Sequence, residues 1–455
     1  MTSLASRKNI KSTSRYLAVS ILEEIETEEA FSNLLLRKVI DNSNLQREEI
    51  NLLTELVYGV LQRKMTLDYQ LAPFLKKQKK LDNWVKQLLR LSLYQMNYLD
   101  RVPDHAIVNE AANIAHARGH RGIVGLVNGV LRNIQRKGLR DFEEIKEVNK
   151  KISIQYSLPV WLVNEFIEEL GVEETKKLAA SLIERPKLSL RVNLKKISRV
   201  EVIEELTKEG YEVEESKISP FGLISLNGVP AETRLFKEGF LAIQDESSML
   251  VAPTLNVAPS HFVLDACAAP GGKTMHIASN YLDEEQDGKI VALDIHQHKI
   301  ELIKGAAKRQ GVDKLVEAIQ LDARKVSSKY QEGTFDRVLV DAPCSGLGLM
   351  RRRPEIRYTK TKKDIKSLQK LQLEILNEAS KTLKSGGELV YSTCTITKLE
   401  NQEVVDQFLK NHPNFSQQTV HFENERLVAD ETGSITIYPH QFDTDGFFIA
   451  RLKKD

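Results

Sequence analysis

The chain has 455 residues, of which 41% are hydrophobic and 28% are charged, and its formal net charge is +2. A single hydrophobic core rarely grows beyond about 250–300 residues, so we expect a multidomain protein. No run approaches the ~18 apolar residues that a membrane-spanning helix needs, and the first residues lack the apolar stretch of a signal peptide. We therefore expect a cytoplasmic protein.

The distribution of charged residues and of cysteines along the chain indicates what the protein binds and the compartment in which it works. Residues 1–140 contain 22 Lys and Arg against 14 Asp and Glu, whereas the rest of the chain has a net negative charge. The basic end is where we expect a polyanion to bind. All three cysteines follow residue 260, and none forms a CxxC pair or a Cys/His cluster with zinc spacing. We expect a reducing compartment, no disulfide framework and no bound metal.

The first segment has helical periodicity throughout. Between Tyr16 and Lys137 apolar residues recur three or four positions apart, as in Leu17, Ile21 and Ile25. We predict an all-helical bundle, an all-α domain, over residues 1–142.

Two further features of this segment concern its surfaces. Gly125 and Gly129 stand four apart on the last expected helix, which predicts the close approach of a neighbouring helix. Basic residues form either solvated helix faces or an RNA-binding surface, and the net positive charge favours RNA. They include Lys76, Lys77, Lys79, Lys80, Arg118, Arg121, Arg132, Arg136 and Lys137.

Residues 150–243 mix helical and strand-like periodicity and predict a small α+β module. This module either contacts RNA through shape and phosphate or acts as a spacer. We expect helices at 160–184 and 198–209, and strands at 188–193, 211–213, 223–226 and 240–243.

Residues 244–455 alternate short apolar strands with helices, which is typical of a doubly wound α/β domain with a mostly parallel sheet. The expected strands are FVLDA, KIVALD, VEAIQLD, FDRVLVD and ELVYST, with helices after Gly272 and at 296–310 and 364–383. In such sheets ligands bind beyond the carboxyl ends of the strands. The residues that follow each strand are therefore candidates for a site.

A glycine-containing loop, CAAPGGK, joins the first of these strands to a helix. Glycines at such a junction let backbone approach a ligand closely, and the helix N-terminus favours negative charge. Asp294 ends the next strand, 23 residues after Gly271, near the spacing of an acidic residue that binds ribose hydroxyls. Asp322 closes the third strand in the same way. The loop residues are Cys267, Ala268, Ala269, Pro270, Gly271, Gly272 and Lys273.

The same loop nearly matches the phosphate-binding pattern GxxxxGK[ST]. In addition, VLVDAP resembles the acidic strand that binds magnesium in NTPases. However, Cys267 occupies the position of the first glycine, and an NTPase explains neither Asp294 nor Asp322. Hydrolysis of ATP or GTP is therefore a minor alternative.

Two cysteines follow strands of the expected sheet, Cys344 in DAPCSG and Cys394 in YSTCT. A free cysteine is most often a small buried hydrophobe. Because the carboxyl ends of parallel strands meet at one edge, we expect both thiols on the face where the ligand binds. This shared placement favours a role in catalysis.

Together the motifs resemble a known family. CAAPGGKT, LD at 293–294, DAPCSG, RRPEIRY, YSTCT and DGFFIARL are similar to the RNA 5-methylcytosine methyltransferases of the NOL1/NOP2/Sun family. The basic front end resembles the NusB-like RNA-binding domain of the bacterial members that modify small-subunit ribosomal RNA. This resemblance covers nearly the whole chain, and it implies a Rossmann-like methyltransferase domain, S-adenosylmethionine as cofactor and 16S rRNA as substrate.

The resemblance also implies roles by position. Cys394 matches the nucleophile of the family, and Cys344 matches the cysteine needed for release of the product. The loop Cys267–Lys273, together with Asp294, Asp322 and Asp341, matches the cofactor-binding positions. Asp341 is also expected to touch the target base. Thr395 departs from the serine that the family more often has, but a hydroxyl is retained.

A thiol suits this chemistry. Carbon 5 of cytosine is a weak nucleophile, and addition of a thiolate to carbon 6 turns the ring into an enamine that accepts a methyl group. The proton on carbon 5 must then leave, and no histidine in these motifs supplies the base. The target base must be unpaired or flipped out. Four arginines that closely follow DAPCSG are expected to hold phosphates beside the site, namely Arg351, Arg352, Arg353 and Arg357.

Three alternatives remain open at this point. An NTPase would bind ATP rather than S-adenosylmethionine, and a binding factor with an inactive catalytic domain is disfavoured by the intact motifs. Methylation of tRNA is the most realistic alternative to methylation of 16S rRNA. We expect a monomer that binds RNA and neither DNA nor a membrane.

Overall fold

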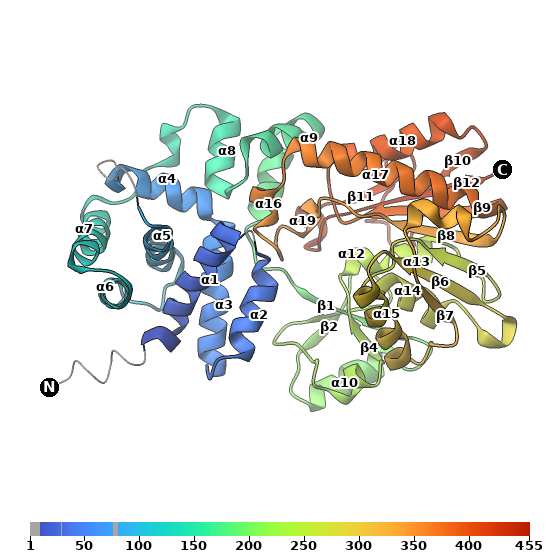
Figure 1. The fold of residues 1–455 in the computed structure, drawn as a ribbon, viewed down its shortest axis with the longest axis horizontal. Coiled ribbons are helices and arrows are strands. Elements are labelled where there is room, and N and C mark those ends of the chain that lie inside the picture. Colours follow the sequence, from blue (N-terminus) through green and yellow to red (C-terminus); the bar gives the residue numbers. More distant parts are fainter. Residues whose placement is uncertain (1–9, 29, 76–80) are drawn as a thin grey trace. The chain divides into compact units, whose positions relative to one another are not determined.

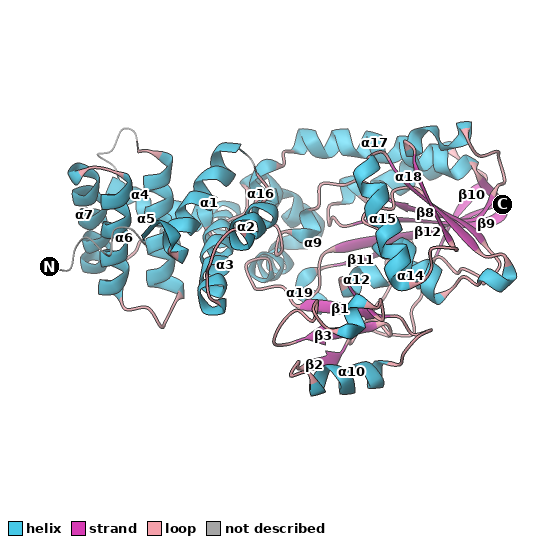
Figure 2. Ribbon diagram, turned by 60° about the horizontal axis from the view of Figure 1, so that its bottom comes forward, coloured by secondary structure: helices cyan, strands magenta, loops and turns pink. Residues whose placement is uncertain are grey.

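A computed structural model of the chain describes residues 10–28, 30–75 and 81–455 (Figure 1). They fall into two compact units, Met1–Glu184 with Met350–Thr359, and Arg185–Leu349 with Lys360–Asp455. The first unit is helical, and the second contains both sheets (Figure 2). None of the described helices combines the length and the apolar character needed to cross a bilayer.

The helical unit contains the predicted all-α bundle. Apolar residues spaced three or four apart, such as Ile21, Leu22 and Ile25, are buried in one continuous core. Two further helices follow the bundle, the second of which is kinked at Gly171. The helices are α1 (Ser14–Glu28), α2 (Ser32–Asp41), α3 (Arg47–Gln62), α4 (Lys64–Leu75), α5 (Asn83–Tyr98), α6 (Asp104–Arg118), α7 (Arg121–Lys137), α8 (Val148–Tyr156) and α9 (Val160–Ser181).

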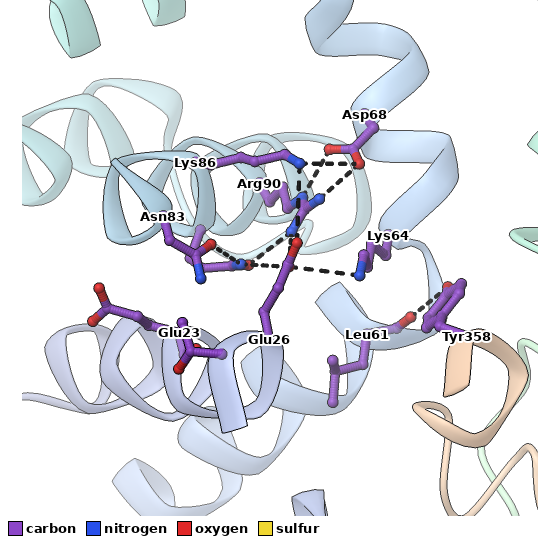
Figure 3. Close-up of polar contacts among 11 residues, drawn as sticks. Glu23, Glu26, Leu61, Lys64, Asp68, Asn83, Lys86, Arg90 and Tyr358 are labelled. Carbon is purple, nitrogen blue, oxygen red and sulfur yellow. Dashed lines mark hydrogen bonds and ion pairs between the residues drawn. The ribbon is translucent and has the colours of Figure 1, made fainter. Parts of the chain in front are cut away.

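A buried arginine joins three of these helices. Arg90 of α5 is 1% exposed and forms ion pairs with Asp68 of α4 and Glu26 of α1 (Figure 3). Burial alone would raise the pKa of Glu26, but the charges of Arg90 and Lys64 outweigh burial and lower this pKa to about 2. Because carboxylates match the buried charge on two sides, removal of either one would leave the charge of Arg90 incompletely compensated in the core.

The expected role of the two glycines on α7 is wrong. A Cβ atom added at Gly125 or Gly129 would meet no atom of the described residues within 4 Å. Both glycines are exposed, so they do not admit a neighbouring helix. The four lysines of the charged loop, Lys76, Lys77, Lys79 and Lys80, lie outside the described residues.

A short segment of the α/β region belongs to the helical unit. Met350–Thr359, which includes helix α16 (Ile356–Thr359), is anchored there by hydrogen bonds. Glu355 accepts bonds from the backbone N–H and the hydroxyl of Ser32. Tyr358 donates to the carbonyl of Leu61 (Figure 3). The chain thus leaves the second unit soon after the DAPCSG motif and returns at Lys360.

The second unit begins with a small antiparallel sheet in the order β2-β3-β1-β4. Leu190 and Val192 alternate along β1 and point into a core that α10 covers. The elements are β1 (Leu188–Val192), α10 (Arg199–Lys208), β2 (Val213–Glu215), β3 (Gly222–Ser225), α11 (Arg234–Lys237) and β4 (Leu241–Ile243). The predicted α+β character of this module is confirmed, although α8 and α9 pack in the helical unit. The division into 1–142, 150–243 and 244–455 remains a proposal.

The large sheet has the strand order β10-β12-β9-β8-β5-β6-β7, with β11 paired to β12. Strands β5 to β9 are parallel, as predicted, and three antiparallel strands that sequence analysis did not predict extend one side. The chain runs outward from β5 in one direction through β6 and β7, and in the other through β8 and β9. The strands are β5 (Phe262–Asp265), β6 (Lys289–Asp294), β7 (Val316–Gln320), β8 (Phe335–Asp341), β9 (Leu383–Thr393), β10 (Phe415–Gln418), β11 (Ile435–Ile437) and β12 (Phe447–Lys454).

Each face of this sheet is covered by helices. Val263 of β5 packs in a core with α14 (Gly272–Asn280) and α15 (Gln297–Gln310), whereas the next residue, Leu264, packs with α17 (Lys362–Lys381) and α18 (Gln402–Asn411). The alternation of side chains along a strand produces these two cores. With both faces covered, the carboxyl edge of the parallel strands remains as the place for a site, at the point between β5 and β8 where the chain direction switches.

Candidate active site

The two predicted cysteines meet at the carboxyl edge of the large sheet. Strands β8 and β9 are neighbours, with Asp341 opposite Ser392, so the loops that follow them are adjacent. Cys344 lies just beyond β8, and Cys394 directly follows β9. Their Sγ atoms are 3.2 Å apart, and both thiols are free and partly exposed. The structure therefore brings together two residues that are 50 positions apart in the sequence.

The surroundings of Cys344 keep its thiol protonated. Its pKa is raised well above the usual value, first by its hydrogen bond with Cys394, then by burial and by the negative charges of Cys394 and Glu400. At neutral pH the thiol of Cys344 is thus protonated, and its S–H lies within hydrogen-bond distance of Cys394 Sγ.

Asp341, at the end of β8, holds a lysine beside the cysteines. Its Oδ2 accepts from Nζ of Lys273 at 2.7 Å, and its Oδ1 accepts from the hydroxyl of Ser392 at 2.8 Å. Burial opposes the charged form of Lys273, but the charge of Asp341 outweighs burial, so the lysine pKa is raised. Lys273, predicted only as a cofactor contact, therefore also forms an ion pair with Asp341.

The glycine loop joins β5 to α14 as predicted. Gly271 caps α14 with φ +103°, a backbone conformation that residues with a Cβ rarely adopt. A Cβ atom added at Gly272 would lie 3.8 Å from the amide of Gln244. The Oε1 atom of that amide is buried and has no hydrogen-bond partner among the described residues, so an acceptor is available beside the N-terminus of α14.

The two other predicted acids end neighbouring strands. Asp294 is the last residue of β6, where it accepts from the backbone N–H of His296 and lies 3.6 Å from Nζ of Lys299. Asp322 follows β7, and Arg324 binds its carboxylate. The bond from Arg324 is the first cause of the lowered pKa of Asp322, so this carboxylate is ionised at neutral pH.

These groups fit the chemistry of S-adenosylmethionine, which combines ribose hydroxyls with an ammonium and a carboxylate. Asp294 and Asp322 supply acceptors for hydroxyl donors, and the unpartnered Oε1 of Gln244 is an acceptor that suits an ammonium. The glycine loop admits a close approach of backbone to the ligand.

Two buried acids of this region were not predicted from the sequence. Asp265, the last residue of β5, is fully buried and accepts from the hydroxyl of Thr274 at 2.6 Å. Glu400, also fully buried, accepts from the backbone N–H of Ser345. The position of Asp265 at a strand end was a signal that could have found it, whereas Glu400 lies in a polar stretch that gives no such signal.

The expected role of the arginines after DAPCSG is wrong for two of them. Arg351 is 2% exposed and Arg357 is fully buried, so neither can reach a phosphate. The guanidinium of Arg357 donates to the backbone carbonyls of Gln62, Tyr156, Leu182 and Met350 within the helical unit. The sequence pattern predicted a surface position for Arg357, but these four carbonyl acceptors stabilise its charge in the interior.

The fold and the site together define a Rossmann-like methyltransferase that uses S-adenosylmethionine. Comparison with known families agrees with this class. Residues 252–453 match the family described as 16S rRNA methyltransferase RsmB/F. Residues 12–136 match the NusB family, and residues 158–232 match the ferredoxin-like domain of RsmF/B-like methyltransferases.

Similarity to individual proteins extends over the whole chain. The probable ribosomal RNA small subunit methyltransferase B of Bacillus subtilis is 44% identical over 98% of this chain and 99% of its own length. The corresponding protein of Synechocystis is 35% identical over 97% of this chain and 99% of its own length. The chain therefore belongs to the family of ribosomal RNA small subunit methyltransferases B. This membership leaves the NTPase alternative without support.

Solved structures share the fold. The protein PH0851 is 28% identical and superposes with a TM-score of 0.80 over 98% of this chain and 99% of its own. A methyltransferase homologue from Pyrococcus horikoshii is 26% identical, with a TM-score of 0.58 over 68% of this chain and all of its own. The three-part architecture is thus confirmed, with a helical NusB domain, a ferredoxin-like module and a methyltransferase domain.

Proposed function

We propose that this protein transfers a methyl group from S-adenosylmethionine to carbon 5 of a cytosine in 16S rRNA through a covalent adduct between Cys394 and carbon 6. The observation that carries the proposal is the 3.2 Å contact between the Sγ atoms of Cys344 and Cys394 at the edge of the sheet. The names of the relatives, which describe methyltransferases of the small ribosomal subunit, support the choice of RNA.

Different residues of this site bind the cofactor and the target base. The loop Cys267–Lys273, Asp294 and Asp322 hold S-adenosylmethionine, which supplies an electrophilic methyl group when bound. Asp341 lies between the loop and the cysteines, because it binds Lys273 and Ser392, and it is the group beside which the target base is held. A neighbouring charged lysine keeps Asp341 ready to accept a hydrogen bond from the exocyclic amine of cytosine.

In the first half of the reaction the thiolate of Cys394 forms a bond to carbon 6. The electron pair of the C5–C6 double bond moves toward carbon 5, which bonds to the methyl group as the bond from this methyl to the sulfonium sulfur breaks and S-adenosylhomocysteine is left. Before the attack, the S–H of Cys344 is within hydrogen-bond distance of Cys394 Sγ and stabilises the thiolate.

In the second half carbon 5 must lose its proton. Once Cys394 is bonded to carbon 6 its sulfur is a neutral thioether, and its charge no longer raises the pKa of Cys344. Cys344 can then release its proton to solvent and take the proton from carbon 5. The electrons of the C–H bond re-form the C5–C6 double bond, and Cys394 leaves as a thiolate.

The choice of RNA is tested by incubating the protein and methyl-labelled cofactor with unmodified 16S rRNA or with unmodified tRNA, and then mapping labelled cytosines. The proposal expects label at carbon 5 of a cytosine in 16S rRNA. Label in tRNA alone would reject 16S rRNA as the substrate and leave the chemistry intact.

A further inference from the structure

Glu400 is a buried carboxylate that the reaction described above does not use. It ends a short 3-10 helix (Lys398–Glu400) that follows the Cys394 loop, and its side chain is fully buried. Burial raises its pKa, and the hydrogen bonds that it accepts act in the opposite direction. A buried carboxylate is costly unless its oxygens are bonded, so the identity of its partners matters.

The partners of Glu400 come from the two loops that carry the cysteines. Oε1 accepts from the backbone N–H of Ser345 at 2.8 Å, and Oε2 accepts from the hydroxyl of Ser345 at 2.6 Å. Thr395 and Thr397 donate to Oε2, each at 3.4 Å. Ser345 directly follows Cys344 and Thr395 directly follows Cys394, so one carboxylate binds the neighbour of each cysteine.

Other bonds reinforce the connection between these loops. The hydroxyls of Ser345 and Thr395 are 2.9 Å apart, and Gly348 donates its backbone N–H to the carbonyl of Cys394 at 3.0 Å. Asn401 donates to the carbonyl of Thr395 at 3.1 Å. The loops are therefore held together by bonds around the cysteines in addition to the contact between the sulfurs.

A carboxylate suits this arrangement. Gln372 also donates to Oε1, at 3.0 Å, so both oxygens of Glu400 face donors. A glutamine at this position would turn its NH₂ group toward the hydroxyls, which would have to rotate and accept, and the strong bonds to a charged oxygen would be replaced by weaker neutral ones. An alanine would remove every bond between the two loops that passes through residue 400.

We propose that Glu400 is a positioning residue that holds the sulfur atoms of Cys344 and Cys394 at contact distance by binding Ser345 and Thr395. The catalytic meaning of this spacing rests on the proposed function, because the two sulfurs act in successive halves of that reaction. The spacing itself is a property of the resting protein and can be measured without RNA.

The rate at which the two thiols form a disulfide reports the spacing of their sulfur atoms. Diamide oxidises two neighbouring thiols to a disulfide and is itself reduced to the hydrazine, which takes up the two protons and two electrons. Disulfide geometry is specific, so the rate reports how well the sulfurs are placed. In the wild type, diamide should join Cys344 to Cys394, as identified by mass spectrometry of peptides.

Three variants probe the carboxylate. Glu400→Gln and Glu400→Ala should slow this oxidation by about tenfold or more, and Ser345→Ala by less, because the backbone bond from residue 345 is retained. Glu403→Gln, an exposed glutamate three positions further on, is the matched control and should react at the wild-type rate. If a Glu400 variant does not fold, Ser345→Ala decides the outcome.

Single-turnover methylation separates positioning from folding. In Glu400→Gln the rate of methyl transfer should fall by about 10²-fold, while the affinity for S-adenosylmethionine should stay within about twofold of wild type, because the proposed cofactor residues are elsewhere. Unchanged rates of disulfide formation in folded Glu400→Gln and Ser345→Ala would overturn the inference. Slowed disulfide formation in a protein that methylates no cytosine would retain the inference and reject the proposed function.

Discussion

Cys344 and Cys394 have different surroundings although their sulfur atoms are in contact. Cys344 follows Pro343, and the residue after it, Ser345, is bound by Glu400. The pKa of Cys344 is raised by its hydrogen bond with Cys394 and by burial. Cys394 directly follows β9. A single cysteine at either place would be an ordinary partly buried thiol. In the proposed reaction the pair supplies an acid and a nucleophile at one site.

The buried carboxyl of Asp265 predicts that the stability of the fold decreases as the pH rises toward 7. Burial raises its pKa from 3.8 to about 7, although the bond from Thr274 acts in the opposite direction. Between these values the folded protein keeps a proton that the unfolded chain has released. The contribution of Asp265 to the free energy of unfolding therefore falls as the pH rises, by about 1.4 kcal/mol per unit until pH about 7.

Asp265→Asn removes this proton and retains an acceptor for Thr274. Its free energy of unfolding relative to wild type should increase by a few kcal/mol between pH 5 and pH 8, as measured by denaturant unfolding at each pH. A difference that stays constant over this range would show that the carboxyl is not titrating in the folded protein.

At the scale of elements, the loops around the candidate active site approach each other so closely that a side chain at the point of contact would clash. Gly348, in the loop after β8, donates to the carbonyl of Cys394 and accepts from the backbone N–H of Gly446 at 2.9 Å. A Cβ atom at position 348 would lie 2.0 Å from the carbonyl oxygen of Gly446 and 2.8 Å from that of Cys394. This close contact gives a physical reason for the glycine, Gly446, that precedes β12 in the DGFFIARL motif.

Gly348→Ala should separate these loops. The extra methyl group is expected to lower the free energy of unfolding by about 1–3 kcal/mol and the rate of methyl transfer by about 10²-fold. The control is Gly305→Ala, on the exposed side of α15, where the part of the chain that the structure describes places no atom within 4 Å of the added Cβ. It should stabilise the helix by about 0.5–1 kcal/mol and leave methylation unchanged, and equal effects of the two changes would refute the packing argument.

The parallel strands could be predicted because their sequences are short apolar runs that end at an acid or a cysteine. The antiparallel strands β10 and β11 could not, because FSQQ and ITI are too short to carry a period of their own. Their pairing with β12 is decided by residues far away in the sequence. Local patterns therefore predicted the parallel strands and the residues of the candidate site, and left the antiparallel side of the sheet undefined.

At the scale of the whole chain, the three types of domain were predictable from periodicity and charge, but the path of the chain between the two units was not. The segment RRRPEIRY is so polar that its pattern predicts an exposed phosphate-binding loop. Arg357 is instead fully buried, because four backbone carbonyls accept from its guanidinium. Glu400 was missed for the same reason, since burial of a charge depends on partners that no single stretch of sequence contains.

The central claim is that two cysteines act in succession on one cytosine, and the most direct test follows the covalent complex. Wild type, Cys394→Ala, Cys344→Ala and the double variant are each incubated with S-adenosylmethionine and unmodified 16S rRNA, and then separated under denaturing conditions. The account predicts that Cys344→Ala accumulates a protein–RNA adduct, whereas Cys394→Ala and the double variant form none and transfer no methyl group. Normal methylation by Cys394→Ala, or an adduct that persists in the double variant, would contradict it.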